Sequence, residues 1–311
     1  MRKIVLIALV LALAIVGGLG AQQKVFLNIA TGGAAGTYYP LGGAMAEIIN
    51  KNVANANATA VTTGASVANV NMLATGEAQL ALIQNDIAYY AFNGVEMFKD
   101  KAQPKLRAIA IFYNETIQIV TLASTGVKSI ADLKGKRVAV GAAGSGTEVN
   151  ARQILEAAGL TYRDITVQYL SFAEAATGLR DGNTDVAFLT AGAPTAAVRD
   201  IAAQKAIAIV PVTKDVADRL IAKYPFYVRV VIPKDTYTQQ TTAVDTVTVK
   251  SMLVASADLD ETLIYNATKA IFSNLERMRQ AHSAANQISK ATAQEGVPIP
   301  LHPGASRFYK E

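Results

Sequence analysis

Two glycine-rich segments decide the fold: TGGAAGTYYP at residues 31–40 and GAAGSGTEVN at residues 141–150. Each follows a short apolar run that is typical of a strand, and each precedes the apolar periodicity of a helix. Further along, LATGEAQLALIQ at 73–84 matches LRDGNTDVAFLT at 179–190. In both copies a helix end, a glycine and a polar link lead into an apolar strand. The repetition predicts two lobes of similar construction.

Outside these segments, short β-branched runs alternate with longer alanine-rich runs, which predicts an α/β fold with substantially parallel sheets. The predicted strands cover residues 25–30, 59–63, 79–83, 106–112, 117–122, 137–141, 164–169, 185–189 and 207–212. The predicted helices cover residues 38–51, 67–74, 147–158, 172–180, 194–205, 215–223 and 259–280. The length of 311 residues exceeds one ordinary compact core and also favours two lobes.

The composition excludes several classes of protein. Hydrophobic residues make up 51% and charged residues 17% of the chain, which excludes a disordered protein. The sequence contains no cysteine, which excludes thiol catalysis, thiolate metal sites, disulfides and lipid attachment through an N-terminal cysteine. The formal net charge of +5 is spread along the chain instead of forming a stripe, which predicts no nucleic-acid binding.

The first residues have the layout of a signal peptide. Two basic residues precede an uncharged stretch, residues 4–23, whose apolar body gives way to glycines. This body is shorter than a membrane-spanning helix requires, so we predict a signal peptide over residues 1–21, cleaved after position 20 or 21. The alternative is an uncleaved membrane anchor. Export without cysteine indicates a periplasmic protein.

The two glycine-rich loops are suited to an anion. The first N–H groups of a helix lack partners within the helix, and the helix dipole makes that end partly positive. Thr37, Ser145 and Thr147 add hydroxyl groups beside those N–H groups. Because the loop occurs twice, we favour a small carboxylate or phosphate enclosed between the lobes. Helix capping alone by Ser145 or Thr147 remains the alternative.

Motifs for nucleotide binding and catalysis are incomplete. The glycine pattern at 144–146 lacks the third glycine of a dinucleotide fingerprint and the lysine of a P-loop. His282 and His302 form no H-E-x-x-H pair, so a histidine metal site or triad is poorly supported. Glu115 and Asp132 are interpreted as solvated surface charges. We therefore predict no metal, no cofactor and no enzymatic activity.

Five segments together resemble the TAXI group, the TRAP-associated extracytoplasmic solute receptors. These segments are TGGAAGTYYPLGGAMAEIIN (31–50), QLALIQNDIAYYAFNG (79–94), GAAGSGTEVNARQILEAAG (141–159), FLTAGAPT (188–195) and PLHPGASRFYKE (300–311). The resemblance implies the type II periplasmic-binding-protein fold, in which two α/β lobes around a ligand cleft are joined by two crossing segments. It implies that lobe one comprises residues 24–113 and 226–311, and that lobe two comprises residues 114–225.

The resemblance also implies a function and a partner. Such a receptor captures a small carboxylate, for example glutamate, glutamine or a related C4 or C5 dicarboxylate, and delivers it to the membrane permease of a sodium-coupled tripartite (TRAP) transporter. It is not an enzyme. Two alternatives remain open: a ligand-sensing adaptor for a membrane signalling protein, and an enzyme that processes a carboxylate.

The ligand is predicted to lie where loops and strand ends of the two lobes meet. The predicted ligand-binding residues lie at a helix start, at a strand end or at the crossing: Gly33, Ala34, Gly36, Thr37, Tyr38, Gln84, Asn114, Ser145, Gly146, Thr147, Thr190, Ala191 and Gly192. The role of Tyr39 is left open between ligand contact and packing, and Asp86 is interpreted as a helix cap.

No arginine lies in any of these loops, although arginine often binds buried carboxylates. Three explanations stay open. Amides and hydroxyls neutralise the ligand, or an arginine from elsewhere reaches the cleft, or the ligand is less acidic than a dicarboxylate.

Overall fold

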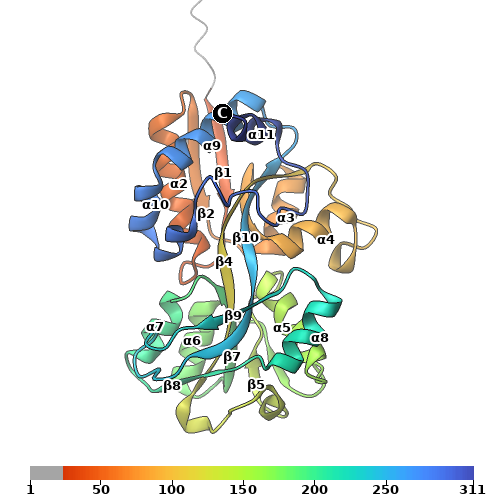
Figure 1. Ribbon diagram of the computed structural model, residues 1–311, viewed down its shortest axis with the longest axis vertical. Helices are drawn as coiled ribbons and strands as arrows, with labels where there is room; N and C mark the ends of the chain where they lie inside the picture. The colour runs from red at the N-terminus through yellow and green to blue at the C-terminus, as the bar shows by residue number, and fades with distance from the viewer. Residues whose placement is uncertain (1–23) are drawn as a thin grey trace, which may run out of the picture.

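The computed structural model describes residues 24–311, and the predicted signal peptide lies outside them. Two lobes lie one above the other in Figure 1. The upper lobe contains β1 (Val25–Ala30), α2 (Tyr38–Asn52), β2 (Ala56–Val61), α3 (Ser66–Thr75), β3 (Leu80–Gln84), α4 (Asn85–Asn93) and the 3₁₀ turn η1 (Glu96–Phe98). It also contains the C-terminal elements α9 (Glu261–Ser273), α10 (Leu275–Ala281), η4 (Ser283–Gln287) and α11 (Pro303–Tyr309).

The lower lobe is built from the middle of the chain. Its elements are η2 (Ala123–Thr125), η3 (Ile130–Leu133), β5 (Arg137–Ala139), α5 (Gly146–Ala157), β6 (Thr166–Gln168), α6 (Phe172–Asp181), β7 (Val186–Ala191), α7 (Ala196–Ala202), β8 (Ile207–Val210), α8 (Lys214–Lys223) and β9 (Val228–Ile232). Most predicted helices agree with these bounds to within a few residues. Among residues 24–311 no helix has both the length and the apolar character that crossing a membrane requires.

Two long strands, β4 (Leu106–Leu122) and β10 (Val244–Ser256), run through both lobes. They lie at the centre of one ten-stranded sheet with the order β2-β1-β3-β10-β4-β7-β5-β6, to which β8 is added on β4 and β9 on β10. The pairs β1 with β2 and β3, and β5 with β6 and β7, are parallel. All pairs that involve β4 or β10 are antiparallel. The sheet is therefore mixed rather than predominantly parallel.

The first crossing differs from the predicted pair of separate strands at 106–112 and 117–122. The intervening residues 114–116 pair with 250–248 of β10, so β4 continues as one strand, with register shifts against β10 between Lys250 and Met252 and between Leu253 and Val254. The second crossing lies in β10, because β9 pairs with residues 244–248 of that strand and the Val212 N–H donates to the Asp245 carbonyl. We propose that lobe two extends to the middle of β10, beyond the boundary expected at residue 225.

Apolar packing attaches the helices to both faces of this sheet. One cluster runs through both lobes under α3, α4, α5 and α8 and includes Ile83, Ile119 and Ile154. Separate clusters fill the opposite face, around Leu27 and Met45 in the upper lobe and around Leu179 and Leu189 in the lower lobe. Full burial of each such side chain is worth about 1.5–3 kcal/mol. The sheet is thus a packed frame that carries the loops between the lobes.

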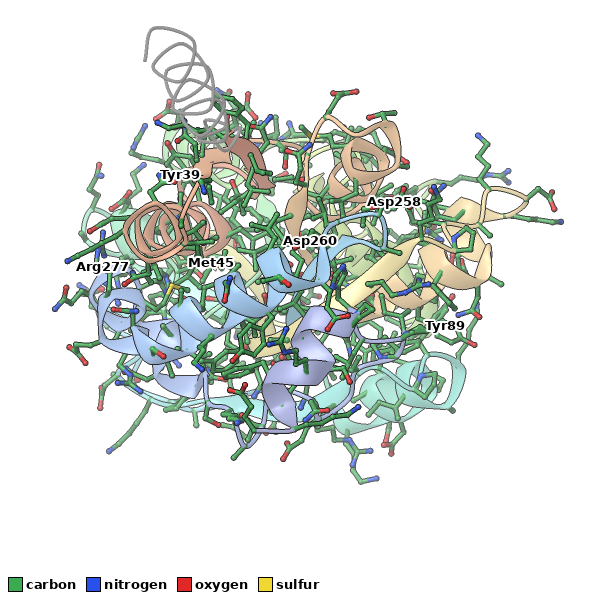
Figure 2. The ribbon with its side chains drawn as sticks, turned by 90° about the horizontal axis from the view of Figure 1, so that it is seen from above. Tyr39, Met45, Tyr89, Asp258, Asp260 and Arg277 are labelled. Atoms are coloured by element: carbon green, nitrogen blue, oxygen red, sulfur yellow. The ribbon has the colours of Figure 1, made fainter. Side chains whose placement is uncertain are left out.

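The helix predicted over 259–280 is divided at Asn274. This residue leaves the helical conformation, with φ −127° and ψ 34°, and its side-chain Nδ2 donates to the Ala270 carbonyl at 2.8 Å. An asparagine side chain can compete with helical hydrogen bonding in this way. The helix therefore ends at Ser273, and a separate helix, α10, begins at Leu275. It packs on α2, where Arg277 pairs with Glu47 at 2.8 Å; Figure 2 shows Arg277 at the outer edge of the upper lobe.

Candidate functional site

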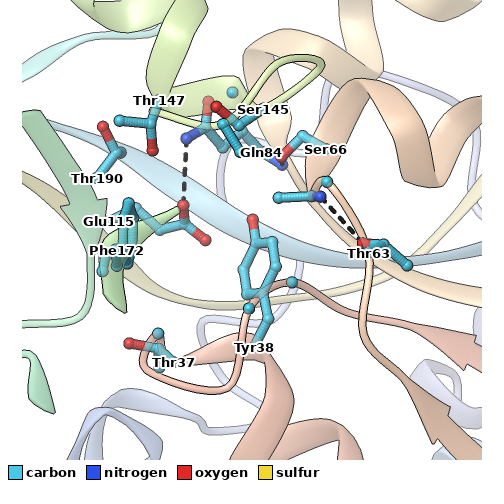
Figure 3. Close-up of a pocket in the computed structure, with 18 of the residues that line it drawn as sticks. Thr37, Tyr38, Thr63, Ser66, Gln84, Glu115, Ser145, Thr147, Phe172 and Thr190 are labelled. Atoms are coloured by element: carbon cyan, nitrogen blue, oxygen red, sulfur yellow. Dashed lines mark hydrogen bonds between the residues drawn. The ribbon is translucent and has the colours of Figure 1, made fainter. Parts of the chain in front are cut away.

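A pocket lies between the two lobes, at the ends of β1, β3 and β7 and the starts of α2 and α5 (Figure 3). It encloses about 580 Å³ of space, part of which is open to solvent. The residues that line it are Gly32, Gly33, Gly36, Thr37, Tyr38, Thr63, Gly64, Ala65, Ser66, Gln84, Tyr113, Glu115, Ala142, Ser145, Gly146, Thr147, Ser171, Phe172, Thr190 and Ala191.

Most of the residues predicted to bind ligand come together in this lining. They are Gly33, Gly36, Thr37, Tyr38, Gln84, Ser145, Gly146, Thr147, Thr190 and Ala191. The two glycine-rich loops therefore face each other across one pocket. Gln84 and Thr190, at the ends of β3 and β7, lie in the same lining. Their contact with a ligand stays a prediction.

Ala34, Asn114 and Gly192 do not line the pocket. Ala34 is exposed on its turn. The Asn114 N–H donates to Gln287 Oε1 at 3.0 Å, so this residue is joined to η4, and it lines a separate hollow. The Gly192 N–H donates to Thr37 Oγ1 at 3.1 Å, which makes it a contact between the lobes. Tyr39, whose role was left open, is 38% exposed and also lies outside the lining.

In the lower lobe, the loop before α5 has two roles: Ser145 caps the helix, and the backbone of Gly146 comes close to the Gln84 side chain of the upper lobe. Ser145 Oγ accepts from the Glu148 N–H at 3.1 Å and so caps the helix, as the alternative for this residue anticipated. Gly146 packs against the Gln84 side chain of the upper lobe. A Cβ at position 146 would lie 2.2 Å from Gln84 Oε1, so only glycine allows this approach.

One wall of the pocket, residues 63–66, was missed by the sequence analysis. Thr63 Oγ1 accepts from the Ala65 N–H at 3.0 Å, and Ser66 Oγ accepts from the Gln84 N–H at 3.2 Å. Ala65 has φ 70° and ψ −148°, a conformation that is strained for a residue with a side chain. Such strain is concentrated at functional sites. The short polar run TTGAS at 62–66, directly before a helix, was the signal that could have identified this wall.

Glu115 is the charged residue of the pocket, and the interpretation of it as a solvated surface charge is wrong. It lies on β4 where that strand passes between the lobes, and it is only 2% exposed. Gln84 Nε2 donates to Glu115 Oε2 at 3.3 Å (Figure 3). Burial raises the pKa of Glu115 to about 8, although the nearby Tyr38 and Gln84 side chains act to lower it. The sequence signal for this burial was a glutamate within the largely apolar run of residues 106–122, which forms β4.

Several buried polar atoms around the pocket have no hydrogen-bond partner. They are Tyr38 OH, Gln84 Oε1, Tyr113 OH, Glu115 Oε1 and Thr190 Oγ1. Each unsatisfied buried group costs about 1–3 kcal/mol, so a polar ligand that pairs with them would recover that energy. No lysine, arginine or histidine is among the lining residues, and within residues 24–311 no three metal-binding side chains gather at one place.

The two lobes also contact each other beside the pocket. The carbonyl of Gly144 accepts from the N–H groups of Val67 and Ala68, both at 3.1 Å, at the start of α3. Asp86 lies in the first turn of α4, which begins at Asn85, and its Oδ1 accepts from the Ile87 N–H at 2.9 Å, as the interpretation as a helix cap expected. Its Oδ2 accepts from Asn150 Nδ2 of α5 at 3.2 Å. Burial raises the pKa of Asp86 to about 7. Asp86 thus joins the lobes instead of facing the ligand.

Comparisons with known proteins agree with this architecture. The model of the NMT1-like family matches residues 29–311. Similar solved structures include a periplasmic transporter, with 12% identity, coverage of 92% of this chain and 91% of that chain, and a TM-score of 0.57. PhnD1 from Prochlorococcus marinus, in complex with methylphosphonate, has 12% identity, coverage of 84% and 90%, and a TM-score of 0.56. A proposed L-cystine ABC transporter protein from Listeria monocytogenes has 15% identity, coverage of 82% and 93%, and a TM-score of 0.51.

At such low identity these structures establish the fold alone, and the predicted fold class is confirmed. The chain has the α/β periplasmic-binding-protein fold with two lobes joined by two crossing strands. The assignment to the TAXI group is wrong, because the family model that matches nearly the whole described chain is that of the NMT1-like family. Glycine-rich loops at helix starts recur in many α/β folds, so the short segments that carried the resemblance did not define the group.

Proposed function

The chain belongs to the NMT1-like family, and on this basis we propose that it is an extracytoplasmic solute-binding protein that captures a small carboxylate for a membrane transporter. The observation that carries this function is the pocket itself. Matching loops of the two lobes line it, so a ligand there touches both lobes at once. That arrangement encloses a small molecule and couples its binding to the relative position of the lobes.

The preference for a carboxylate is supported by the donors that surround the pocket. Gly146 and Thr147 begin α5, where backbone N–H groups lack partners within the helix and favour an anion. The hydroxyl of Thr190 is buried and unpaired at the same pocket. PhnD1, which shares the fold, is in complex with methylphosphonate, another small anion.

Closure of the lobes is the mechanism that we propose for capture and delivery. A ligand that contacts both lobes only when they are closed favours the closed state by its difference in affinity for the two states. The Thr37 contact to Gly192 and the Gly144 contacts to α3 are formed in the same closed state. A membrane transporter that recognises the closed form would then receive loaded protein in preference to empty protein.

Support for the location and the partner comes from the N-terminus and from the similar structures. Residues 1–21 have the pattern of an export signal, and one similar structure is a periplasmic transporter. The protein from Listeria monocytogenes carries the name of an ABC transporter, which favours a transporter of that class as the partner. We propose binding without catalysis, so the ligand is expected to leave the protein unchanged.

Native mass spectrometry of the gently purified protein, followed by denaturation, tests this function. Release of an unaltered small acid is the expected result. Release of a chemically altered product would contradict a binding protein and favour an enzyme. If no molecule is released, a thermal-shift screen of organic acids and amino acids replaces it, because a bound ligand stabilises the folded state. The absence of any stabilisation across that screen would then contradict the proposal.

A further inference from the structure

Two acceptor atoms in the pocket need a hydrogen-bond donor from the ligand, and a carboxylate group does not supply one. Glu115 is buried, and Gln84 Nε2 donates to its Oε2 at 3.3 Å, while the hydroxyls of Tyr38 and Ser251 lie near the carboxyl and act to lower its pKa. Because this bond uses the amide nitrogen of Gln84, the amide oxygen Oε1 faces away from the bond. Both Gln84 Oε1 and Glu115 Oε1 are buried acceptors without a donor.

A purely anionic ligand offers no hydrogen to these two oxygens, so it leaves Gln84 Oε1 and the Oε1 of an ionised Glu115 without a donor. A carboxylate beside an ionised Glu115 would also meet a like charge in a buried site, and no lysine, arginine or histidine lines the pocket to offset either charge. A protonated amine, by contrast, offers three N–H donors and a positive charge.

The pocket also contains donors that would serve an acid. Tyr38, Tyr113 and Thr190 have buried hydroxyls without partners, and the start of α5 presents Gly146 and Thr147. Figure 3 shows Tyr38 reaching toward Glu115 and Gln84, with Thr147 and Thr190 on the side of the lower lobe. One pocket therefore has both an acceptor pair and a set of donors.

We infer that Glu115 determines specificity in this pocket, and that the ligand is a zwitterion whose ammonium group binds Glu115 and Gln84 and whose carboxylate binds the hydroxyls and the start of α5. This inference rests on the proposed solute-binding function. It excludes dicarboxylates that lack an amine as the preferred ligands. It also explains how the pocket binds an acid without an arginine.

The charge on Glu115 then depends on the ligand. Burial raises the pKa of this carboxyl to about 8, so in the closed pocket without a ligand it is largely protonated at neutral pH. The groups that face it are Tyr38 of α2, Gln84 of β3, Tyr113 of β4, Ser251 of β10 and, at longer range, Asp86 of α4. None of them carries a positive charge, so a bound ammonium would be the only cation beside Glu115 in the pocket lining. Binding would therefore lower its pKa and release a proton.

Isothermal titration calorimetry of the full protein tests the inference with matched probes. The probes are the common amino acids and the same acids without the amine, for example L-glutamate with glutarate and L-glutamine with glutaramate. Titrations at pH 6, 7 and 8, in two buffers of different ionisation enthalpy, measure both affinity and proton release. The variant is Glu115→Gln, which keeps the shape of the side chain and removes its charge.

We expect at least one amino acid to bind tenfold or more tightly than its partner without the amine. Its affinity should rise with pH from 6 to 8, and its enthalpy should depend on the buffer because a proton is released. Glu115→Gln should weaken that amino acid tenfold or more, remove the buffer dependence, and change the affinity of the amine-free acid less than threefold.

Equal affinity of the wild-type protein for both members of every pair would overturn the inference, whether or not the variant folds. So would a Glu115→Gln variant that binds the amino acid as well as the wild type does. In both cases the solute-binding function stands, because an acid is still bound. If no amino acid binds, the inference is also overturned, while the molecule released in native mass spectrometry decides the function separately.

Discussion

Gly146 shows how one residue links the lobes and the pocket. Its Cα lies so close to the Gln84 amide that a Cβ would come within 2.2 Å of Gln84 Oε1. The Gln84 side chain is buried and bonded to Glu115, so it cannot move away without breaking that bond. A methyl group at position 146 must therefore either displace Gln84 or hold the lobes apart.

Gly146→Ala is expected to weaken ligand binding tenfold or more while the protein stays folded. The matched control is Gly43→Ala in α2, where an added Cβ meets nothing within 4 Å and the backbone is helical. The control should keep wild-type affinity and raise the free energy of unfolding by roughly 0.5–1 kcal/mol. Calorimetry and urea unfolding measure the two quantities. Unchanged affinity in Gly146→Ala would show that the contact with Gln84 does not support the pocket.

At the scale of elements, the start of each loop helix contacts the opposite lobe. Thr37 precedes α2 but makes no capping bond with its side chain; instead it accepts from the Gly192 N–H that follows β7. The start of α3 is bonded to Gly144 of the lower lobe. The N–H groups at the start of α3, which would otherwise need water, are thus satisfied across the lobe boundary when the lobes are closed.

Thr37→Val should destabilise the closed state, because it leaves the buried Gly192 N–H without an acceptor at a cost of about 1–3 kcal/mol. The affinity for the ligand should fall by roughly tenfold, in line with that cost. Thr37→Ser, which keeps the hydroxyl, is the control and should retain most of the affinity. Calorimetry on both variants decides the point. An equal loss in the serine variant would assign the effect to the methyl group instead.

At the scale of the whole molecule, two buried carboxyls make stability depend on pH. Burial raises the pKa of Glu115 to about 8 and that of Asp86 to about 7. Between the ordinary pKa of each group and its raised value, the folded state binds more protons than the unfolded state. The free energy of unfolding should therefore fall as the pH rises from about 4 to 8, by up to about 1.4 kcal/mol per pH unit for each group.

Urea unfolding of the ligand-free protein at pH 5, 6, 7 and 8 measures this slope. Asp86→Asn and Glu115→Gln should each make it shallower. Asn150 Oδ1 has no partner and is available to accept from the new amide at position 86. The control is Asp132→Asn, because hydrogen bonds lower the pKa of that exposed carboxyl and it does not titrate in this range. A wild-type stability that rises with pH over this interval would contradict the prediction.

Lobe closure can be measured directly because the sequence contains no cysteine. Cysteines introduced at the exposed positions Lys51 in the upper lobe and Arg163 in the lower lobe allow specific attachment of two spin labels or dyes. The distance between them should shorten when the ligand identified by mass spectrometry is added. A pair at Lys51 and Asp258, both in the upper lobe, should not change. An unchanged distance between the lobes would argue against closure as the mechanism.

The sequence by itself determined the alternation of strands and helices up to residue 223, the similar construction of the lobes, and most of the residues predicted for the pocket, but it did not predict β9 and β10. These features depend on local patterns, such as apolar periodicity and the glycine–hydroxyl run at a helix start, which act over a few neighbouring residues. The resemblance between residues 31–40 and 141–150 was sufficient to predict that Thr37 and Thr147 face one site.

Only the tertiary structure decided the chemistry at the centre of the pocket. Glu115 is buried because β4 passes between the lobes at that point, and Thr63 and Ser66 form a wall because α3 contacts Gly144 of the other lobe. Asp86 joins the lobes because Asn150, which is distant in the sequence, lies beside it and donates to it across the lobe boundary. Whether a charged side chain is solvated or buried depends on elements far away in the chain, and no local pattern contains that information.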